Sequence, residues 1–482
     1  MSQREAPFWD ALTAYARAGV VPFHTPGHKL KPGAFARLKA VLGEGFFSLD
    51  PSDEIEDLEL NHDFEQALAR AEQLAAELFG ASRSLFLVNG TTGGLHFLLM
   101  PTKGPVLIPR FSHQAVYSAM VLSQGRAVYL PAAYDPTWLV PLPPAVGNVE
   151  KAVQEVHPEA LVITHPTYYG TVSDLDELGK LAKSSGVLLF ADEAHGGHFL
   201  FSQELPKPAL QCGADAVVQS THKTLGSFTQ TSMLHCNDIS WFSKVVQARQ
   251  ALQTTSPSLV FLAVLDEVRR ELAVQGRKLV GEAVELGRLC QKSLSSLKYV
   301  EVLPDHLNAD PTKIVFSLRQ LGLTGLEVER ILRVDYNIQV ELSDYYNVLA
   351  LISLGDTLES VERLVQAVGD LAARRAHLGR RPLPCYTMDF PELPPAVLSL
   401  REGFFRDKEL IPLEQAVGRI SGGFLTPYPP GVPLIVPGEV FTQEIVEYAL
   451  WCAGIDWSMR GLMAGQNVLA LKDNGGLCRT VR

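Results

Sequence analysis

Short apolar runs alternate with longer amphipathic stretches from about residue 65 onward. The apolar runs have the length and composition of buried strands, and they lie at 84–88, 105–108, 127–130, 160–164, 187–191 and 214–218. Helical periodicity fills the stretches between them, such as 113–122 and 174–184. The second of these places leucines on one face and follows Ser173, the predicted N-cap. This alternation predicts a mostly parallel sheet, buried on both faces.

The pattern changes after residue 251. A long helical stretch at 258–292 leads to a second, smaller α/β region, with predicted strands at 300–303 and 312–317 and a helix at 324–333. A polar, proline-containing linker follows at 379–384. We therefore predict four parts: an N-terminal segment at 1–64, a large domain at 65–290, a small α/β domain at 291–378 and an α+β C-terminal domain at 379–482.

Composition narrows the class of protein. The chain has 482 residues, and 42 basic against 53 acidic residues give a formal charge of −11, with no dense Lys/Arg stripe. We therefore expect no nucleic-acid partner. The six cysteines form no CxxC pair, which predicts reduced thiols, no zinc site and a cytoplasmic location. The charged N-terminus is unlike a signal peptide, and no apolar run is long enough to cross a membrane.

The segment Val88-Asn89-Gly90-Thr91-Thr92-Gly93-Gly94 follows a predicted strand and opens a helix. Small residues let backbone N–H groups approach a phosphate, and the threonine hydroxyls add donors at a helix N-terminus. Gly90, Thr91 and Thr92 are therefore candidate phosphate ligands. A tight strand-to-helix turn with no ligand remains the alternative.

Asp192, in Phe190-Ala191-Asp192-Glu193-Ala194-His195, ends another apolar strand. A buried carboxylate needs a partner, and the protonated nitrogen of a pyridine ring would supply one. Ala194 is small enough to face such a ring, and His195 is placed to contact its 3-hydroxyl oxygen. The alternatives are a structural Asp–His pair, or a metal site completed by His198.

Lys223 lies 31 residues beyond Asp192, just past the run 214–218 and within Ser220-Thr221-His222-Lys223. A lysine at a strand end, with a carboxylate at the end of an earlier strand, is typical of a pyridoxal phosphate site, where the lysine forms a Schiff base with the aldehyde. Ser220 and His222 are candidate phosphate donors. His113 is a candidate for stacking on the ring, although a histidine at a helix start is also a common cap.

Taken together, these segments resemble the bacterial Orn/Lys/Arg decarboxylase family, a branch of the fold-type I, aspartate aminotransferase-like pyridoxal phosphate enzymes. The resemblance covers most of the chain, and five segments carry it: Phe23–Lys29 (FHTPGHK), Asp192–His198, Ser220–Leu234, Thr254–Ser258 (TTSPS) and Thr426–Glu439 (TPYPPGVPLIVPGE). Because the phosphate segment begins as early as Asn89, the chain is similar to the short form without an N-terminal wing domain.

The resemblance implies a role for each candidate residue. Lys223 would carry the Schiff base and Asp192 would pair with the ring nitrogen, while the histidines and hydroxyls would hold the ring and the phosphate as described above. It also implies that Thr255 or Ser256 reaches the phosphate of a neighbouring subunit. The active site would then belong to a homodimer, or to a larger assembly of dimers.

An acidic segment departs from the family pattern. The family has His-Pro and Gly after its acidic residues, whereas this chain has Asn61-His62-Asp63-Phe64. Asp53, Glu54 and Asp57 are candidate ligands for the distal cationic group of a substrate. A solvated acidic loop is the alternative.

We therefore expect decarboxylation of a basic amino acid to its amine and carbon dioxide, with arginine favoured over lysine and ornithine and a place in polyamine biosynthesis. His222 and Lys223 are both candidates for returning a proton to Cα. Two alternatives stay open: another fold-type I enzyme, such as an aminotransferase or a lyase, and a catalytically silent regulator that binds pyridoxal phosphate.

Overall fold

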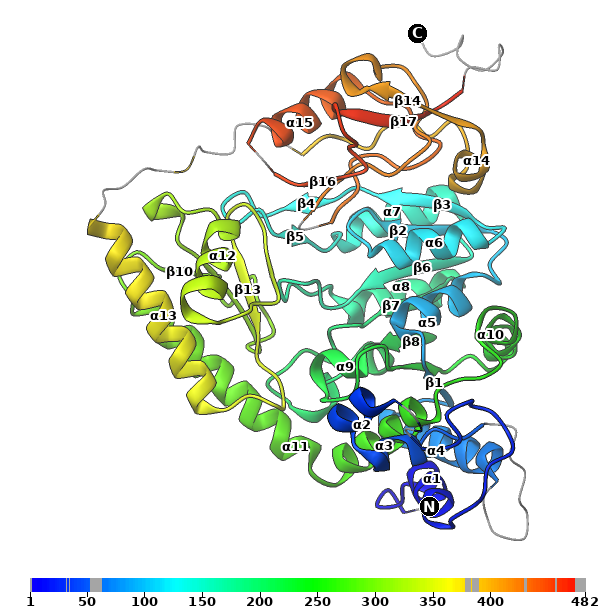
Figure 1. The fold of residues 1–482 in the computed structure, drawn as a ribbon. Coiled ribbons are helices and arrows are strands. Elements are labelled where there is room, and N and C mark those ends of the chain that lie inside the picture. Colours follow the sequence, from blue (N-terminus) through cyan, green and yellow to red (C-terminus); the bar gives the residue numbers. More distant parts are fainter. Residues whose placement is uncertain are drawn as a thin grey trace. The chain divides into compact units, whose positions relative to one another are not determined.

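The computed structural model describes residues 2–31, 33, 35–52, 63–377, 383, 390–428, 431–455 and 457–472. These residues form two compact units, and the chain passes between the units more than once (Figure 1). The first unit spans Met1–Leu98, Phe190–Gln203 and Lys207–Glu282. The second spans Leu99–Leu189, Glu204–Pro206 and Ala283–Arg482. The four predicted domain boundaries stay a prediction.

The first unit holds helices on both sides of a strand cluster. Its strands are β1 (Arg83–Leu87), the last three residues of β7 (Leu188–Asp192), β8 (Ala216–Gln219) and β9 (Ser232–Cys236). Its helices are α1 (Pro7–Arg17), α2 (Ala36–Leu42), α3 (Glu44–Ser48), α4 (Phe64–Phe79), α5 (Gly90–Leu99), α9 (Thr221–Thr224), α10 (Ile239–Leu252) and the first part of α11 (Leu259–Ser295).

The strands of the first unit follow the order β1-β9-β8-β7 in the central sheet. β7 and β8 run parallel, so that Asp192 lies opposite Val218, whereas β9 is antiparallel to both β1 and β8. Helix α5 packs directly against this sheet at Gly94. A Cβ atom there would lie 2.5 Å from a Val218 methyl and 2.7 Å from a Leu87 methyl, so glycine permits the close approach.

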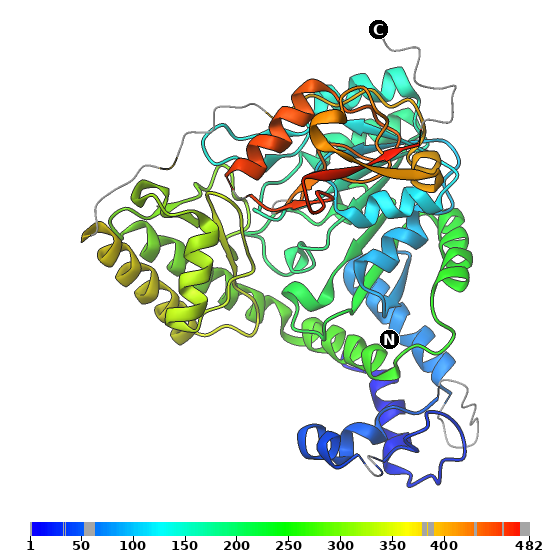
Figure 2. The same ribbon diagram turned by 45° about the horizontal axis from the view of Figure 1, so that its top comes forward.

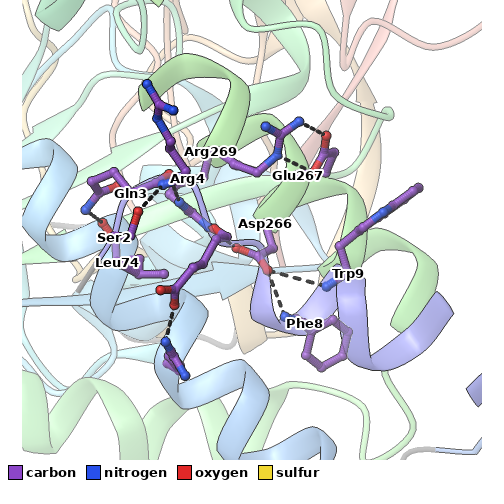
Figure 3. Close-up of polar contacts among 12 residues, drawn as sticks. Ser2, Gln3, Arg4, Phe8, Trp9, Leu74, Asp266, Glu267 and Arg269 are labelled. Carbon is purple, nitrogen blue, oxygen red and sulfur yellow. Dashed lines mark hydrogen bonds and ion pairs between the residues drawn. The ribbon is translucent and has the colours of Figure 1, made fainter. Parts of the chain in front are cut away.

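The N-terminal helix α1 is held by a buried ion pair on α11, shown in Figure 3. Ala6, the N-cap of α1, makes no side-chain cap, and the carboxylate of Asp266 takes its place by accepting from Phe8 N at 2.8 Å and Trp9 N at 3.4 Å. Arg269 binds that carboxylate and also donates to the carbonyl of Gln3 at 3.0 Å. Both charged side chains are fully buried. An acidic residue far away in the sequence thus accepts hydrogen bonds from backbone amides at the start of α1 that have no partner within the helix.

The second unit contains the remaining elements. Its strands are β2 (Pro105–Pro109), β3 (Arg126–Leu130), β4 (Ala133–Tyr134), β5 (Pro141–Leu142), β6 (Ala160–Thr164), β10 (Glu301–Val302), β11 (Lys313–Ser317), β12 (Leu342–Ser343), β13 (Val348–Leu351), β14 (Lys408–Pro412), β15 (Thr426–Pro427), β16 (Met459–Arg460) and β17 (Asn467–Leu471). Its complete helices are α6 (Gln114–Leu122), α7 (Val146–Val156), α8 (Leu175–Ser185), α12 (Gly325–Tyr336), α13 (Leu358–His377), α14 (Leu400–Phe405) and α15 (Gln443–Gly454).

Strand pairing and hydrophobic packing organise the second unit. Strands β6, β2 and β3 lie side by side in the central sheet and run parallel. A four-stranded antiparallel sheet, β10-β11-β13-β12, packs against α12 and α13 around residues such as Phe316 and Leu332. Near the C-terminus, α15 lies beside the antiparallel pair of β14 and β17, seen in orange and red in Figure 2.

Most of the predicted elements are confirmed within two or three residues, and so is the mostly parallel sheet. One cap prediction is wrong: the N-cap of α8 is Asp174, whose carboxylate accepts from Glu177 N at 3.2 Å. Ser173 precedes the cap and is buried. Its hydroxyl therefore does not reach the first turn of the helix.

We predict that Asp266→Ala lowers the free energy of unfolding by about 3–5 kcal/mol, because it strands the buried Arg269 charge and uncaps α1. Urea denaturation would measure the loss. Glu267→Ala is the matched control on the same helix, since Glu267 pairs with Arg270 where both side chains are about a quarter exposed, and its loss should stay below about 1 kcal/mol. Equal losses in the two variants would contradict the assignment.

Candidate active site

Three buried hydroxyl groups meet at the start of α5. Thr91 Oγ1 lies 2.6 Å from Ser220 Oγ and 3.2 Å from Ser232 Oγ. The backbone of Gly90 has φ +64°, a conformation that glycine adopts without strain, and its N–H donates to the carbonyl of Gln230 at 2.8 Å. Hydroxyl donors at a helix N-terminus make a suitable cradle for a phosphate. The structure therefore brings the predicted Thr91 and Ser220 together, and adds Ser232.

Thr92 differs from its neighbour. Its side chain is exposed, whereas that of Thr91 is buried with the other hydroxyls. Ser232 was not among the predicted ligands, although it lies within the segment Ser220–Leu234. Only the pairing of β9 with β1 and β8 brings Ser232 to Thr91, and the sequence pattern did not predict that strand.

Asp192 ends β7 and is 2% exposed. Its Oδ1 accepts from Ala194 N at 3.2 Å, which fixes the carboxylate over the turn that follows the strand. Because β7 and β8 are parallel, Asp192 and the segment that begins at Ser220 emerge at the same edge of the sheet. Ligands of parallel sheets bind at such an edge. A carboxylate buried there is suited to a cationic partner.

Lys223 lies in the short helix α9, and its ammonium group meets His195. The distance from Lys223 Nζ to His195 Nε2 is 2.9 Å, and His195 is 4% exposed. A charged Lys223 donates to Nε2, which places the proton of a neutral His195 on Nδ1. The two predicted site residues are therefore within proton-exchange distance.

His222 points one ring nitrogen toward the backbone. Its Nδ1 lies 2.8 Å from the carbonyl of Thr231, so this nitrogen carries a proton and donates. The contact anchors the ring to the segment before β9. A role for His222 at a phosphate stays a prediction.

His113 belongs to the second unit, where it caps α6. Its Nδ1 accepts from Ala115 N at 3.1 Å, which leaves the proton of a neutral ring on Nε2. The side chain is exposed and lines a pocket of about 360 Å³ that also includes Tyr168, Lys408 and Arg460. The cap and the predicted stacking role are compatible, because the cap uses only one edge of the ring.

Thr255 and Ser256 lie in the exposed loop between α10 and α11. Within this loop, Thr254 Oγ1 accepts from Ser256 N at 3.2 Å. A cavity of about 550 Å³ adjoins the loop and is lined by Thr255 together with apolar residues that include Phe8 and Phe64. The loop is therefore accessible to a neighbouring molecule, as its predicted role requires.

Glu193 is a second carboxyl group at the end of β7, and it is fully buried. One oxygen accepts from Ala209 N at 2.8 Å and the other from Gln219 Nε2 at 2.6 Å. Burial, aided by the neighbouring charge of Asp192, raises the pKa of Glu193 from its ordinary 4.5 to about 8 despite these bonds. Glu193 therefore binds a proton at neutral pH, and it links the end of β7 to the last residue of β8.

The remaining sequence predictions concern substrate-binding acidic residues, metal ligands and membrane spans. Asp53, Glu54 and Asp57 lie outside the described residues. Within the described part of the chain, no group of three or more His, Cys, Asp or Glu side chains is arranged to hold a metal ion. In the same part of the chain, no helix has the length and apolar character needed to span a membrane.

Comparison with known proteins identifies the family. The model of the Orn/Lys/Arg decarboxylase major domain matches residues 6–309, and the model of the C-terminal domain of the same family matches residues 396–466. The chain belongs to the Orn/Lys/Arg decarboxylase family. It is thus a pyridoxal phosphate-dependent decarboxylase, which confirms the predicted enzyme class and cofactor.

The alignments with related proteins cover nearly the whole of this decarboxylase chain. An arginine decarboxylase of Bacillus anthracis is 36% identical over 464 residues, covering 93% of each chain, and one of Bacillus subtilis is 35% identical over 461 residues, covering 93% of this chain and 94% of its own. The solved constitutive lysine decarboxylase of Escherichia coli has a TM-score of 0.78 at 21% identity, covering 97% of this chain and 82% of its own. These likenesses confirm the fold-type I architecture.

The site residues fit the cofactor of the family. The buried hydroxyls of Thr91, Ser220 and Ser232 form a phosphate cradle, Asp192 offers a buried carboxylate for the ring nitrogen, and Lys223 offers an amine. Each group comes from the first unit and lies at or just beyond a strand end. The individual roles stay predictions.

The raised pKa of Glu193 predicts a pH dependence of stability. Because the folded state binds this proton more tightly than the unfolded state, the stabilisation is complete below about pH 4.5 and declines as the pH rises toward 8, by up to about 1.4 kcal/mol per pH unit. Glu193→Gln cannot titrate and should lose this slope, so its stability should gain on the wild type between pH 5 and 8.

Urea denaturation at several pH values would measure this difference. Glu177→Gln, at an exposed position on α8, is the control and should follow the wild-type slope. Identical slopes in the wild type and in Glu193→Gln would show that Glu193 is ionised in the folded protein.

Proposed function

We propose that this enzyme decarboxylates arginine to its amine and carbon dioxide, with Lys223 as the cofactor-binding lysine. The observation that carries the proposal is the common sheet edge at the ends of β7 and β8, where the buried carboxylate of Asp192 and the segment of Lys223 emerge together. Arginine is favoured because relatives named arginine decarboxylases are 35–36% identical, whereas those named lysine decarboxylases are 22–25% identical.

When bound, pyridoxal phosphate supplies an electron sink for the pair left on Cα as carbon dioxide departs. The hydroxyls of Thr91 and Ser220, with the N-terminus of α5, would hold its phosphate. The Asp192 carboxylate would hold a proton on the ring nitrogen, an arrangement that also offsets the cost of burying this charge.

Proton transfer to Cα is assigned to Lys223. Its contact with His195 at 2.9 Å gives it a partner that can exchange a proton, whereas His222 directs a protonated ring nitrogen to the carbonyl of Thr231. This arrangement favours Lys223 over His222 as the acid.

The proposal extends to a cytoplasmic homodimer that supplies an amine for polyamine biosynthesis. The described cysteines, Cys212, Cys236, Cys290 and Cys452, are buried free thiols, which supports a reducing compartment. The exposed loop of Thr255 and Ser256 supports a shared active site. Apolar side chains in the first 50 residues, among them Phe23 at 92% exposure, support coverage by a second copy.

Incubation of the holoenzyme with arginine, lysine or ornithine tests the reaction. We expect carbon dioxide release with kcat/KM for arginine higher on the order of tenfold or more, since a planar guanidinium and an ammonium are recognised differently. Lys223→Ala should lose both turnover and the visible absorbance of the bound cofactor. Lys180→Ala, an exposed lysine on α8, is the control and should behave as wild type.

Two outcomes would contradict this reading. Amino transfer to pyruvate without carbon dioxide would indicate an aminotransferase. Lack of turnover of all three amino acids by the cofactor-saturated protein would indicate a regulator.

Asp192→Asn should lower kcat by about 10²–10³-fold, equivalent to about 2.7–4 kcal/mol, because the neutral amide no longer stabilises the charge that develops on the ring. Carbon dioxide release, measured on protein whose bound cofactor is quantified by absorbance, gives the rate per occupied site. Asp174→Asn replaces the exposed N-cap of α8 with another good N-cap residue, and this variant should retain the wild-type rate. A near-normal rate in Asp192→Asn would remove Asp192 from the mechanism.

A further inference from the structure

The second unit contains a buried ion pair close in sequence to His113, the histidine predicted to stack on the cofactor ring. Arg110 directly follows β2, and Glu439 ends the segment Thr426–Glu439. Arg110 Nη1 and Nη2 donate to the two carboxylate oxygens of Glu439 at 2.8 and 2.7 Å. The two side chains are 1% and 2% exposed. Such a bidentate pair fixes both distance and orientation.

Arg110 also binds the backbone of the C-terminal segment. Its Nε donates to the carbonyl of Pro433 at 2.8 Å, and Nη2 donates to that of Leu434 at 3.0 Å. Glu439 in turn accepts from Val436 N at 2.9 Å. One guanidinium group thus fixes the course of the chain from Pro433 to Glu439.

The backbone of Arg110 is hydrogen-bonded to α6, the helix that His113 caps, and to the end of β3. Tyr117 OH, on α6, donates to the carbonyl of Arg110 at 2.6 Å, and Arg110 N donates to Leu130 O at 2.9 Å. Only Phe111 and Ser112 separate Arg110 from His113, and both are buried. Arg110 is therefore connected to the start of α6 both by the short intervening backbone and by the hydrogen bond from Tyr117.

The pocket beside His113 is lined by residues that follow Arg110 in the sequence and by residues that precede Glu439. Ser112 and His113 line it together with Pro433 and Pro437. The segment held by Arg110 therefore borders the space that the His113 side chain faces. No acidic residue lines this pocket in the described part of the chain, and the carboxylate of Glu439 accepts hydrogen bonds from Arg110 and from Val436 N.

From this geometry we propose that Arg110 and Glu439 are positioning residues, which hold the C-terminal segment against the start of α6 and so set the orientation of the His113 side chain. The inference rests on the proposed role of His113. It gives the C-terminal segment from Pro433 to Glu439 a part in positioning an active-site residue.

Glu439→Gln tests the proposal, because it keeps the shape of the side chain and removes its charge. In the cofactor-free protein, we expect faster amide hydrogen exchange over residues 111–122. In the holoenzyme, we expect a shifted visible absorption band, faster cofactor release and kcat lower on the order of 10- to 100-fold with KM little changed. If this variant does not fold, Arg110→Lys replaces it, since an ammonium keeps the charge but not the bidentate fork.

Asp266→Asn is the matched control, because it weakens a fully buried Arg–carboxylate pair in the first unit. It should lower the melting temperature without altering the absorption band or the release of the cofactor. If Glu439→Gln behaves like this control, with unchanged absorbance, release and exchange, the pair is only structural and the proposal is wrong.

A double-mutant cycle tests the route through His113. Glu439→Gln should add little to the effect of His113→Ala on the absorption band and on kcat, since both act on the same ring. Additive effects would show that Glu439 acts by another route and would overturn the proposal. Absence of arginine turnover in the wild type would contradict only the proposed function, because absorbance and exchange do not require turnover.

Discussion

Two consecutive carboxyl groups, Asp192 and Glu193, are buried at the end of one strand, and the chemistry of the site depends on how this constraint is met. Two carboxylates side by side in a dry interior repel each other and lose their hydration. Glu193 meets the constraint by binding a proton near neutrality while accepting from Ala209 and Gln219. Asp192 lies directly beside it and is 2% exposed, and the role proposed for its carboxylate is to pair with the protonated ring nitrogen of the cofactor.

The same arrangement ties the geometry of neighbouring strands together. Gln219 is the last residue of β8 and precedes Ser220 of the hydroxyl cluster. The hydrogen bond that its side-chain amide donates to Glu193 therefore fixes the end of β8 relative to the turn after β7. A neutral Glu193 keeps this link without placing a second negative charge next to Asp192. One side chain thus both holds the end of β8 in place and limits charge repulsion at the end of β7.

Sequence reasoning located the parts of the site that depend on local pattern. The strand at 160–164 was predicted with its observed bounds, and Asp192 was correctly placed at a strand end because an apolar run precedes it in the sequence. Strand β9 was missed, since Ser232–Cys236 mixes polar and apolar residues that are all buried and shows no alternation. Without β9, neither the position of Ser232 nor the anchor of His222 could be predicted.

Contacts between distant segments leave no periodic signal, and the ion pair of Arg110 with Glu439 and the cap that Asp266 makes on α1 illustrate this limit. Arg110 and Glu439 are 329 residues apart, and Asp266 lies 258 residues from the helix start that it caps. The segment Thr426–Glu439 contributed to the family resemblance, but the sequence alone gave no physical reason for the residues found in it. The structure supplies one for Glu439, whose carboxylate neutralises the guanidinium that also binds the backbone carbonyls of Pro433 and Leu434. The glutamate at this position therefore pairs with a single buried arginine, which lies three residues before His113.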